Sequence, residues 1–235
     1  HLYAVLLNLL FIEDFLLTDP FKCKDFLLYL FFIIIYFICD KTELLGLLHC
    51  NEVDQHRHDW LLKTLESYVP PAQLHLLSVT HLDRRSIGSM RPGAYDKVLV
   101  DAPCSNDRSW LYTPDTNQGK IILRKRKKKV LQVPKQYYAI SKAVRPGGVV
   151  VYSTRTMSRA KNQSVVEAML AFYQGVELLE MEQHLIDSLS DHFCFAHFHP
   201  SVGQLVIPQK GKTWGPMYVS RLRRIYKQFK NMVER

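Results

Sequence analysis

The chain has 235 residues, and 47% of them are hydrophobic, which favours one substantial folded domain and argues against a disordered chain. The formal net charge of +9 favours a polyanionic partner, because clustered Lys and Arg side chains displace counterions from nucleic acid. The cysteines are scattered, odd in number and without a CxxC pair, which argues against a disulfide framework or an all-cysteine zinc site and favours a reducing compartment. They are Cys23, Cys39, Cys50, Cys104 and Cys194.

The N-terminal part, residues 1–45, differs in composition from the rest of the chain. It contains no glycine and includes an unbroken apolar run over residues 26–39. A membrane-spanning helix needs about 20 such residues, so we expect a buried helix or strand here and no stable membrane association. Because every position of the run is apolar, its periodicity does not distinguish a helix from a strand.

From residue 47 onwards, apolar strand patterns alternate with helical patterns. Asp54 is placed to cap the first helix, which Pro70 and Pro71 close. Alternation of this kind predicts an α/β fold with a doubly wound, mostly parallel sheet that helices cover on both faces, and an antiparallel hairpin at its C-terminal end. Predicted strands cover residues 47–51, 74–79, 97–101, 149–154, 204–208 and 215–222, and predicted helices cover residues 54–67, 133–144 and 161–173.

Acidic and small residues follow the predicted strands. Glu52 comes directly after the first of these strands, Asp83 follows the second, and the segment from Asp101 to Cys104 (DAPC) ends the third. The carboxyl ends of parallel strands meet at one edge of a sheet, where doubly wound folds bind their ligands. We therefore expect these residues to line a single cleft.

Four segments carry a resemblance to a known family. They are NEVDQHRHDWL from Asn51, YDKVLVDAPCSNDRSWL from Tyr95, RPGGVVVYST from Arg145 and GKTWGPMYV from Gly211. Together they resemble the Nop/Sun (RsmB-type) RNA cytosine-5 methyltransferases, over about residues 47–225. Within that family the likeness is greatest to members that modify methionine tRNA in mitochondria.

This resemblance implies a Rossmann-like methyltransferase fold, S-adenosylmethionine as the cofactor, no metal, and RNA, in particular tRNA, as the partner. It implies a mitochondrial location, with the cytoplasm or the nucleus as the alternative. The reaction needs a thiolate that adds to C6 of cytosine, so that C5 attacks the sulfonium methyl group before the C5 proton and the thiolate leave. The target base must be unstacked or single-stranded, which fits a tRNA loop.

The resemblance assigns cofactor-binding roles to three acids. Glu52 corresponds to the acid that holds the ribose hydroxyls, and the alternative is an exposed capping acid. Asp83 corresponds to the acid near the adenine amino group, and the alternative is a loop acid paired with Arg84 or Arg85. Asp101 corresponds to the acid beside the cofactor and the target base, and the alternative is a helix or turn cap.

Two cysteine positions of the family decide whether this chain is expected to be active. Cys104 corresponds to the catalytic helper cysteine, which assists release of the methylated base, and the alternative is a buried inert thiol. Arg155, within YSTRT, stands where the family has its nucleophilic cysteine. A guanidinium is always protonated and cannot add to C6, so a binding role toward a phosphate or toward Asp101 is what Arg155 retains.

A second departure concerns the cofactor. The family's first strand leads into a glycine-rich loop that lets the backbone approach the methionine part of the cofactor. No glycine precedes Gly46, and residues 31–45 occupy the expected position. We therefore predict poor or absent cofactor affinity, and we interpret residues 1–45 as a divergent segment outside the family's sequence and residues 46–235 as the methyltransferase domain.

The functional hypothesis is thus an impaired RNA cytosine-5 methyltransferase. The alternative is a catalytically dead RNA-binding relative or a non-functional gene product. Methylation of an exocyclic amine ranks last, because the DAPC segment lacks the aromatic residue that such enzymes use at this point.

Three further signals are less specific. Residues 124–129 (RKRKKK) fit an RNA contact, a nuclear-import signal or a solvated loop. Residues 221–230 (RLRRIYKQFK) fit an RNA path or a solvated helix face. Cys194, His197 and His199 lack a fourth ligand at a fitting spacing, so we predict a strand with alternating aromatic residues there rather than a zinc site.

Overall fold

The computed structural model describes residues 4–8, 47–69, 71–102, 104, 141–181, 183–197, 202–209 and 215–225. Several predicted features lie outside these residues: the apolar run at 26–39, the cationic run at 124–129, most of the predicted helix at 133–144, His199 and residues 226–230. Across the described ranges, no helix is long and apolar enough to cross a membrane.

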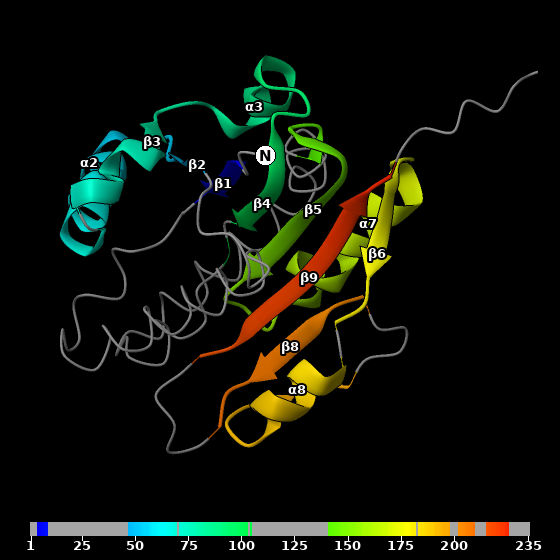
Figure 1. The fold of residues 1–235 in the computed structure, drawn as a ribbon. Helices are drawn as coiled ribbons and strands as arrows, with labels where there is room; N and C mark the ends of the chain where they lie inside the picture. The colour runs from blue at the N-terminus through cyan, green and yellow to red at the C-terminus, as the bar shows by residue number, and fades with distance from the viewer. Residues whose placement is uncertain are drawn as a thin grey trace, which may run out of the picture.

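Five parallel strands form the part of the sheet that carries the expected site (Figure 1). Their spatial order is β3-β2-β1-β4-β5, and every neighbouring pair is parallel. This arrangement confirms the doubly wound, mostly parallel sheet that the sequence predicts. The strands are β1 (Ala4–Asn8), β2 (Leu47–Asn51), β3 (Leu77–Thr80), β4 (Tyr95–Asp101) and β5 (Val144–Thr154).

The C-terminal strands extend the sheet in the antiparallel direction. β9 (Met217–Arg224) pairs with β5, and β8 (Gln204–Ile207) pairs with β9, both antiparallel. This pair confirms the predicted C-terminal hairpin. β6 (Val176–Leu179) pairs with the other end of β9, and β7 (Cys194–Phe195) pairs with β8, which places a strand at Cys194 as predicted.

Helix α2 (Gln55–Tyr68) covers one face of the sheet. It begins at the predicted residue because the Asp54 carboxylate accepts a hydrogen bond of 3.1 Å from the Arg57 backbone N–H. Its Leu61 and Leu65 are buried among apolar side chains of β2, β4 and β5. Burying a leucine side chain contributes about 1.5–3 kcal/mol, so this contact holds α2 against the sheet.

The opposite face packs against α3 (Arg84–Met90) and α7 (Gln163–Phe172). Ile87, Val166 and Met169 are almost fully buried there, among the alternate side chains of β4 and β5. Because successive strand residues point to opposite faces, these two strands supply both cores. The described residues also form α8 (Gln183–Ser190) and two 3-10 helices, η2 (Pro71–Leu76) and η4 (Arg159–Lys161).

The strand predicted over residues 74–79 is wrong in its first half. The structure has a 3-10 helix, η2 (Pro71–Leu76), followed by the strand β3. Pro71 lies at the first position of η2, where its fixed φ suits a helical turn and its missing N–H is not needed. The apolar spacing of this segment fits a single 3-10 turn as well as a strand, so the pattern alone did not separate them.

β5 starts at Val144, five residues before the predicted start, so the Pro-Gly-Gly segment lies inside the strand. The register between β4 and β5 shifts between Tyr95 and Lys97, which accommodates this segment. A Cβ on Gly148 would lie 2.5 Å from the Asp96 carbonyl oxygen. Glycine is therefore required by close packing at this point, and not only by a turn.

The strand between β2 and β4 also differs from the expectation. We expected residues 31–45 at this position, whereas the structure places β1 there, with Leu6 paired to both His49 and Val98. Residues 31–45 lie outside the described part of the chain. The apolar content of a segment does not determine which strands it pairs with, since that depends on residues far away in sequence.

Candidate active site at the carboxyl edge of the sheet

The carboxyl ends of the parallel strands bring the candidate residues to one edge. Glu52 follows β2, Asp101 ends β4 and Arg155 follows β5. The strand order reverses between β1 and β4, which is the switch point where doubly wound sheets bind their ligands. Only β1 separates β2 from β4, so their ends lie about 10 Å apart.

The Glu52 carboxylate is held rigidly and keeps one oxygen available. Its side chain is 1% exposed, which excludes the alternative of an exposed capping acid. Oε1 accepts hydrogen bonds from the Asp54 backbone N–H (2.8 Å) and from Nη2 of Arg57 (3.0 Å). Oε2 is buried and has no hydrogen-bond partner among the described residues. Leaving a buried acceptor unpaired costs about 1–3 kcal/mol, so a ligand hydroxyl that donated to Oε2 would be stabilised here.

Asp83 caps helix α3. Its carboxylate accepts from the Arg85 backbone N–H (2.9 Å) and from Arg85 Nε (2.8 Å), and its side chain is 41% exposed. This is the ion pair that the alternative reading describes, and the role beside adenine stays a prediction. The loop that carries Asp83 is tied to the end of β2, because the Asn51 side chain donates to the Leu82 carbonyl (3.0 Å) and accepts from its N–H (2.9 Å).

Asp101, Cys104 and Arg155 are in direct contact. Nη2 of Arg155 lies 3.3 Å from Oδ2 of Asp101, and the two side chains are only 12% and 15% exposed. The Arg155 backbone N–H donates to Sγ of Cys104 at 3.3 Å. The structure thus brings the position of the family nucleophile together with the acid and the cysteine of the DAPC segment, as the resemblance implies.

Asn162 fixes the turn that carries Arg155, and the sequence analysis did not identify it. The Thr154 hydroxyl donates to Asn162 Oδ1 (2.6 Å), and Asn162 Nδ2 donates to the Thr156 carbonyl (2.8 Å). All three residues are fully buried. Their signal in the sequence is weak, since an asparagine before an apolar helical run also fits an ordinary helix cap.

A buried chain of hydrogen bonds lies behind Glu52, and it was also missed. Thr80 donates its hydroxyl proton to Asn51 Oδ1 (2.9 Å), so Nε2 of His49, 2.6 Å from that hydroxyl oxygen, must be the donor. Nδ1 of His49 then accepts from the Tyr95 hydroxyl. Burial, followed by the nearby Arg91 charge, lowers the pKa of His49 to about 4, which keeps the imidazole neutral.

The described cysteines differ in their surroundings. Burial raises the pKa of Cys50 to about 12, so this thiol is inert at neutral pH. Cys104 is half-buried and Cys194 is exposed. In the part of the chain that the structure describes, no group of three or more His, Cys, Asp or Glu side chains is arranged to hold a metal ion.

The side chains at this edge of the sheet are of the types that bind a nucleoside and a base. A buried carboxylate oxygen after β2 suits a hydroxyl donor, and an Asp–Cys–Arg cluster after β4 and β5 suits a polar heterocycle or a phosphate. A doubly wound sheet with this edge defines a Rossmann-like methyltransferase fold. The sequence model described as 16S rRNA methyltransferase RsmB/F matches residues 38–223, so the chain belongs to the RsmB/F methyltransferase family.

Relatives and solved structures agree with this assignment. The zebrafish (Danio rerio) mitochondrial tRNA (cytosine(34)-C(5))-methyltransferase is 74% identical over 186 residues, covering 79% of this chain and 51% of that protein. Its mouse (Mus musculus) counterpart is 44% identical over 180 residues, covering 76% of this chain and 51% of the mouse protein. The chain thus spans about half the length of these curated relatives.

The crystal structure of NSun6 from Pyrococcus horikoshii with SFG has a TM-score of 0.61 and 20% identity to this chain. The match covers 94% of this chain and 48% of the NSun6 chain. A methyltransferase homologue from the same organism has a TM-score of 0.53 and 19% identity. The match covers 77% of this chain and 54% of that homologue. At these identities the likeness confirms the fold.

Proposed function

We propose that residues 46–235 form the S-adenosylmethionine-dependent catalytic domain of an RNA cytosine-5 methyltransferase that acts on tRNA in mitochondria, with catalysis impaired by Arg155. The observation that carries the proposal is the contact of Arg155 with both Asp101 and Cys104, because it joins the nucleophile position to the DAPC segment. The tRNA substrate and the mitochondrial location are supported by the names of the zebrafish and mouse relatives.

The described residues fit the nucleoside half of the cofactor. When bound, S-adenosylmethionine supplies a sulfonium methyl group to the target carbon. Oε2 of Glu52, buried and unpaired among the described residues, would accept a proton from a ribose hydroxyl. Asp83 pairs with Arg85 in the structure, and by family resemblance it would accept from the adenine amino group. Asp101 would lie between the cofactor and the base.

Methyl transfer to C5 needs a sulfur atom at the position of Arg155. The thiolate forms an S–C6 bond, the C5–C6 π electrons shift to C5, and C5 takes the methyl group. Loss of the C5 proton to a base restores the double bond and expels the thiolate, which Cys104 assists by family resemblance. Arg155 cannot perform the first step, because its guanidinium stays protonated and is already paired with Asp101.

The second candidate is a catalytically dead RNA-binding relative, and Arg155 also favours it. A guanidinium beside a half-buried cysteine would bind a phosphate or a base edge without reacting. The two candidates differ in what they expect of the cofactor: the impaired enzyme binds it weakly, and the dead relative does not bind it.

Titration calorimetry with S-adenosylmethionine tests this difference. We expect weak binding that Glu52→Gln weakens by a further factor of about ten or more, because a charge-assisted hydrogen bond to the ribose is lost. Glu66→Gln, at an exposed position of α2, is the matched control and should leave binding unchanged. No heat in the parent chain, together with retained tRNA binding, would leave only the dead relative. Unchanged binding in Glu52→Gln would exclude the assigned role of Glu52.

We also propose that residues 1–45 are not family sequence but the translation of AT-rich non-coding DNA, through a misdrawn exon or a degraded gene copy. Their Phe, Ile, Leu, Tyr and Lys bias supports this, and the family match leaves residues 1–37 outside it, although it includes residues 38–45. Sequencing transcripts tests it: we expect one that joins a glycine-rich loop directly upstream of Leu47. A transcript that encodes residues 1–45 in frame would contradict the proposal.

A further inference from the structure

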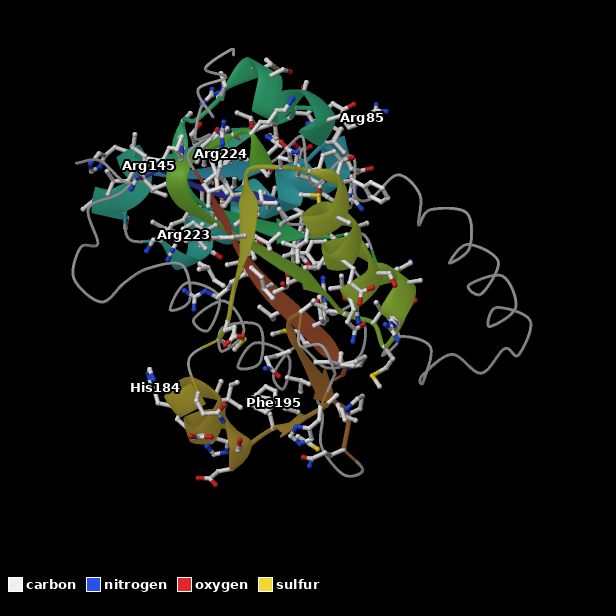
Figure 2. All side chains as sticks on the ribbon, turned by 90° about the vertical axis from the view of Figure 1, so that its right-hand side faces the viewer. Arg85, Arg145, His184, Phe195, Arg223 and Arg224 are labelled. Atoms are coloured by element: carbon white, nitrogen blue, oxygen red, sulfur yellow. The ribbon has the colours of Figure 1, made fainter. Side chains whose placement is uncertain are left out.

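A group of cations lies at the amino edge of the parallel strands, opposite the candidate active site. We name it the amino-edge basic surface. It consists of Lys97, Lys142, Arg145, Arg223 and Arg224. Figure 2 labels Arg145, Arg223 and Arg224 in the left part of the view and Arg85 in the right part.

The register of the strands brings two of these cations together. Lys97 on β4 and Arg223 on β9 both pair with Val149 of β5, so the three side chains share one face of the sheet. With β5 alone between their strands, Lys97 and Arg223 are about 10 Å apart.

Hydrogen bonds anchor the rim of this surface. Nη1 of Arg224 donates to the Lys142 carbonyl at 2.7 Å and also to the Val144 carbonyl, which fixes the end of β9 against the start of β5. Arg145 follows directly and pairs with Asp96. Lys142 lies in the turn before β5, and the strands of the sheet set the positions of the other cations.

The surface keeps an excess of positive charge. Among the described residues, Asp96 pairs with Arg145, and Glu177 pairs with Arg223 at 3.2 Å. The side chains of Arg145 and Arg223 are 48% and 46% exposed, so both also face solvent. The cations of this surface, in a chain of net charge +9, form an attractive surface for a polyanion.

We infer that the amino-edge basic surface binds backbone phosphates of the stem of the same RNA whose loop enters the candidate active site. The inference rests on the proposed RNA substrate. Five residues of β5 separate Val149, at this surface, from Thr154 at the site, which is about 17 Å. At about 3.4 Å of duplex per phosphate, roughly five base pairs cover this distance. Phosphate contacts would fix the orientation of the RNA without reading its sequence.

Two synthetic RNAs test the inference by fluorescence anisotropy: a hairpin with a stem of roughly five base pairs, and its loop of about seven nucleotides alone. The variant Arg145→Gln/Arg223→Gln should bind the hairpin about tenfold more weakly and should lower the slope of log K against log salt by about two. Its affinity for the loop alone should not change. The matched control Lys63→Gln, exposed on α2, should leave both affinities unchanged.

Weaker binding in the double variant could also result from misfolding, so a variant that is expected to bind more tightly serves as a second test. Glu177→Gln removes the acid that neutralises Arg223, and it should tighten hairpin binding about two- to threefold at low salt and steepen the slope. An equal loss for hairpin and loop in the double variant, or no loss for either, overturns the inference. So does weaker hairpin binding in Glu177→Gln. A parent chain that binds neither RNA contradicts the proposed RNA substrate itself, and this inference with it.

Discussion

Arg155→Cys should give the chain a covalent reaction with RNA that the parent chain lacks. RNA with 5-fluorocytosine at the target position is the probe, because fluorine at C5 cannot leave as a proton and the S–C6 bond then persists after methyl transfer. Loss of a catalytic nucleophile costs on the order of 10⁶ in rate, and we expect the variant to recover at least about 10²-fold with excess S-adenosylmethionine. The measurement is the denaturant-stable adduct on a gel.

Two further variants make this result specific. Arg155→Ser removes the same ion pair to Asp101 but supplies only a weakly nucleophilic hydroxyl, so it should form no adduct. Arg155→Cys/Cys104→Ser should still form the adduct, because Cys104 assists the later release of the base. An adduct in the parent chain that disappears in Cys104→Ser would place the nucleophile at Cys104 and contradict the prediction.

The stability of the fold should fall steeply below neutral pH because of His49. Its pKa is 6.5 in the unfolded chain and about 4 in the folded one, since burial disfavours the imidazolium. The unfolded state therefore binds the proton first as the pH falls. The full contribution of His49 to the free energy of unfolding is present above pH 6.5, and it is lost progressively as the pH falls to about 4. The shift corresponds to about 3 kcal/mol of free energy of unfolding.

Urea unfolding at pH 7, 6, 5 and 4, roughly spanning that window, measures the effect. His49→Gln has no titrating ring, so the free-energy difference between the parent chain and this variant should shrink by about 3 kcal/mol from pH 7 to pH 4. His184→Gln is the control: His184 is exposed on α8 (Figure 2), and its loss should leave the pH dependence unchanged. A constant difference between His49→Gln and the parent chain would rule out the assigned role of His49.

Local sequence was sufficient for the elements whose signals are local. The strand at residues 97–101 is a short apolar run that ends in an acid, and the start of α2 is marked by Asp54 as its cap. The positions of Glu52 and Asp101 followed, because parallel strands place their carboxyl ends at one edge. The family resemblance then supplied what residue patterns alone did not, namely the significance of Arg155.

Features that depend on distant residues were not predictable in this way. The turn around Arg155 is fixed by Asn162 on a later element, and the neutral state of His49 depends on burial within the fold and on the charge of Arg91. The sequence around each of these residues does not indicate which distant residue it contacts. The 3-10 helix η2 was missed for the opposite reason, because its short apolar pattern fits two conformations equally well.

β1 links two halves of the sheet. Its backbone pairs with β2 on one side and with β4 on the other, through residues such as Leu7, which lies opposite both Cys50 and Leu99. A truncation that removed it would leave β2 and β4 each with a row of unpaired amide and carbonyl groups, and exposed rows of this kind recruit other chains into aggregates. The two halves therefore stay soluble as one sheet only while some strand fills the gap between them.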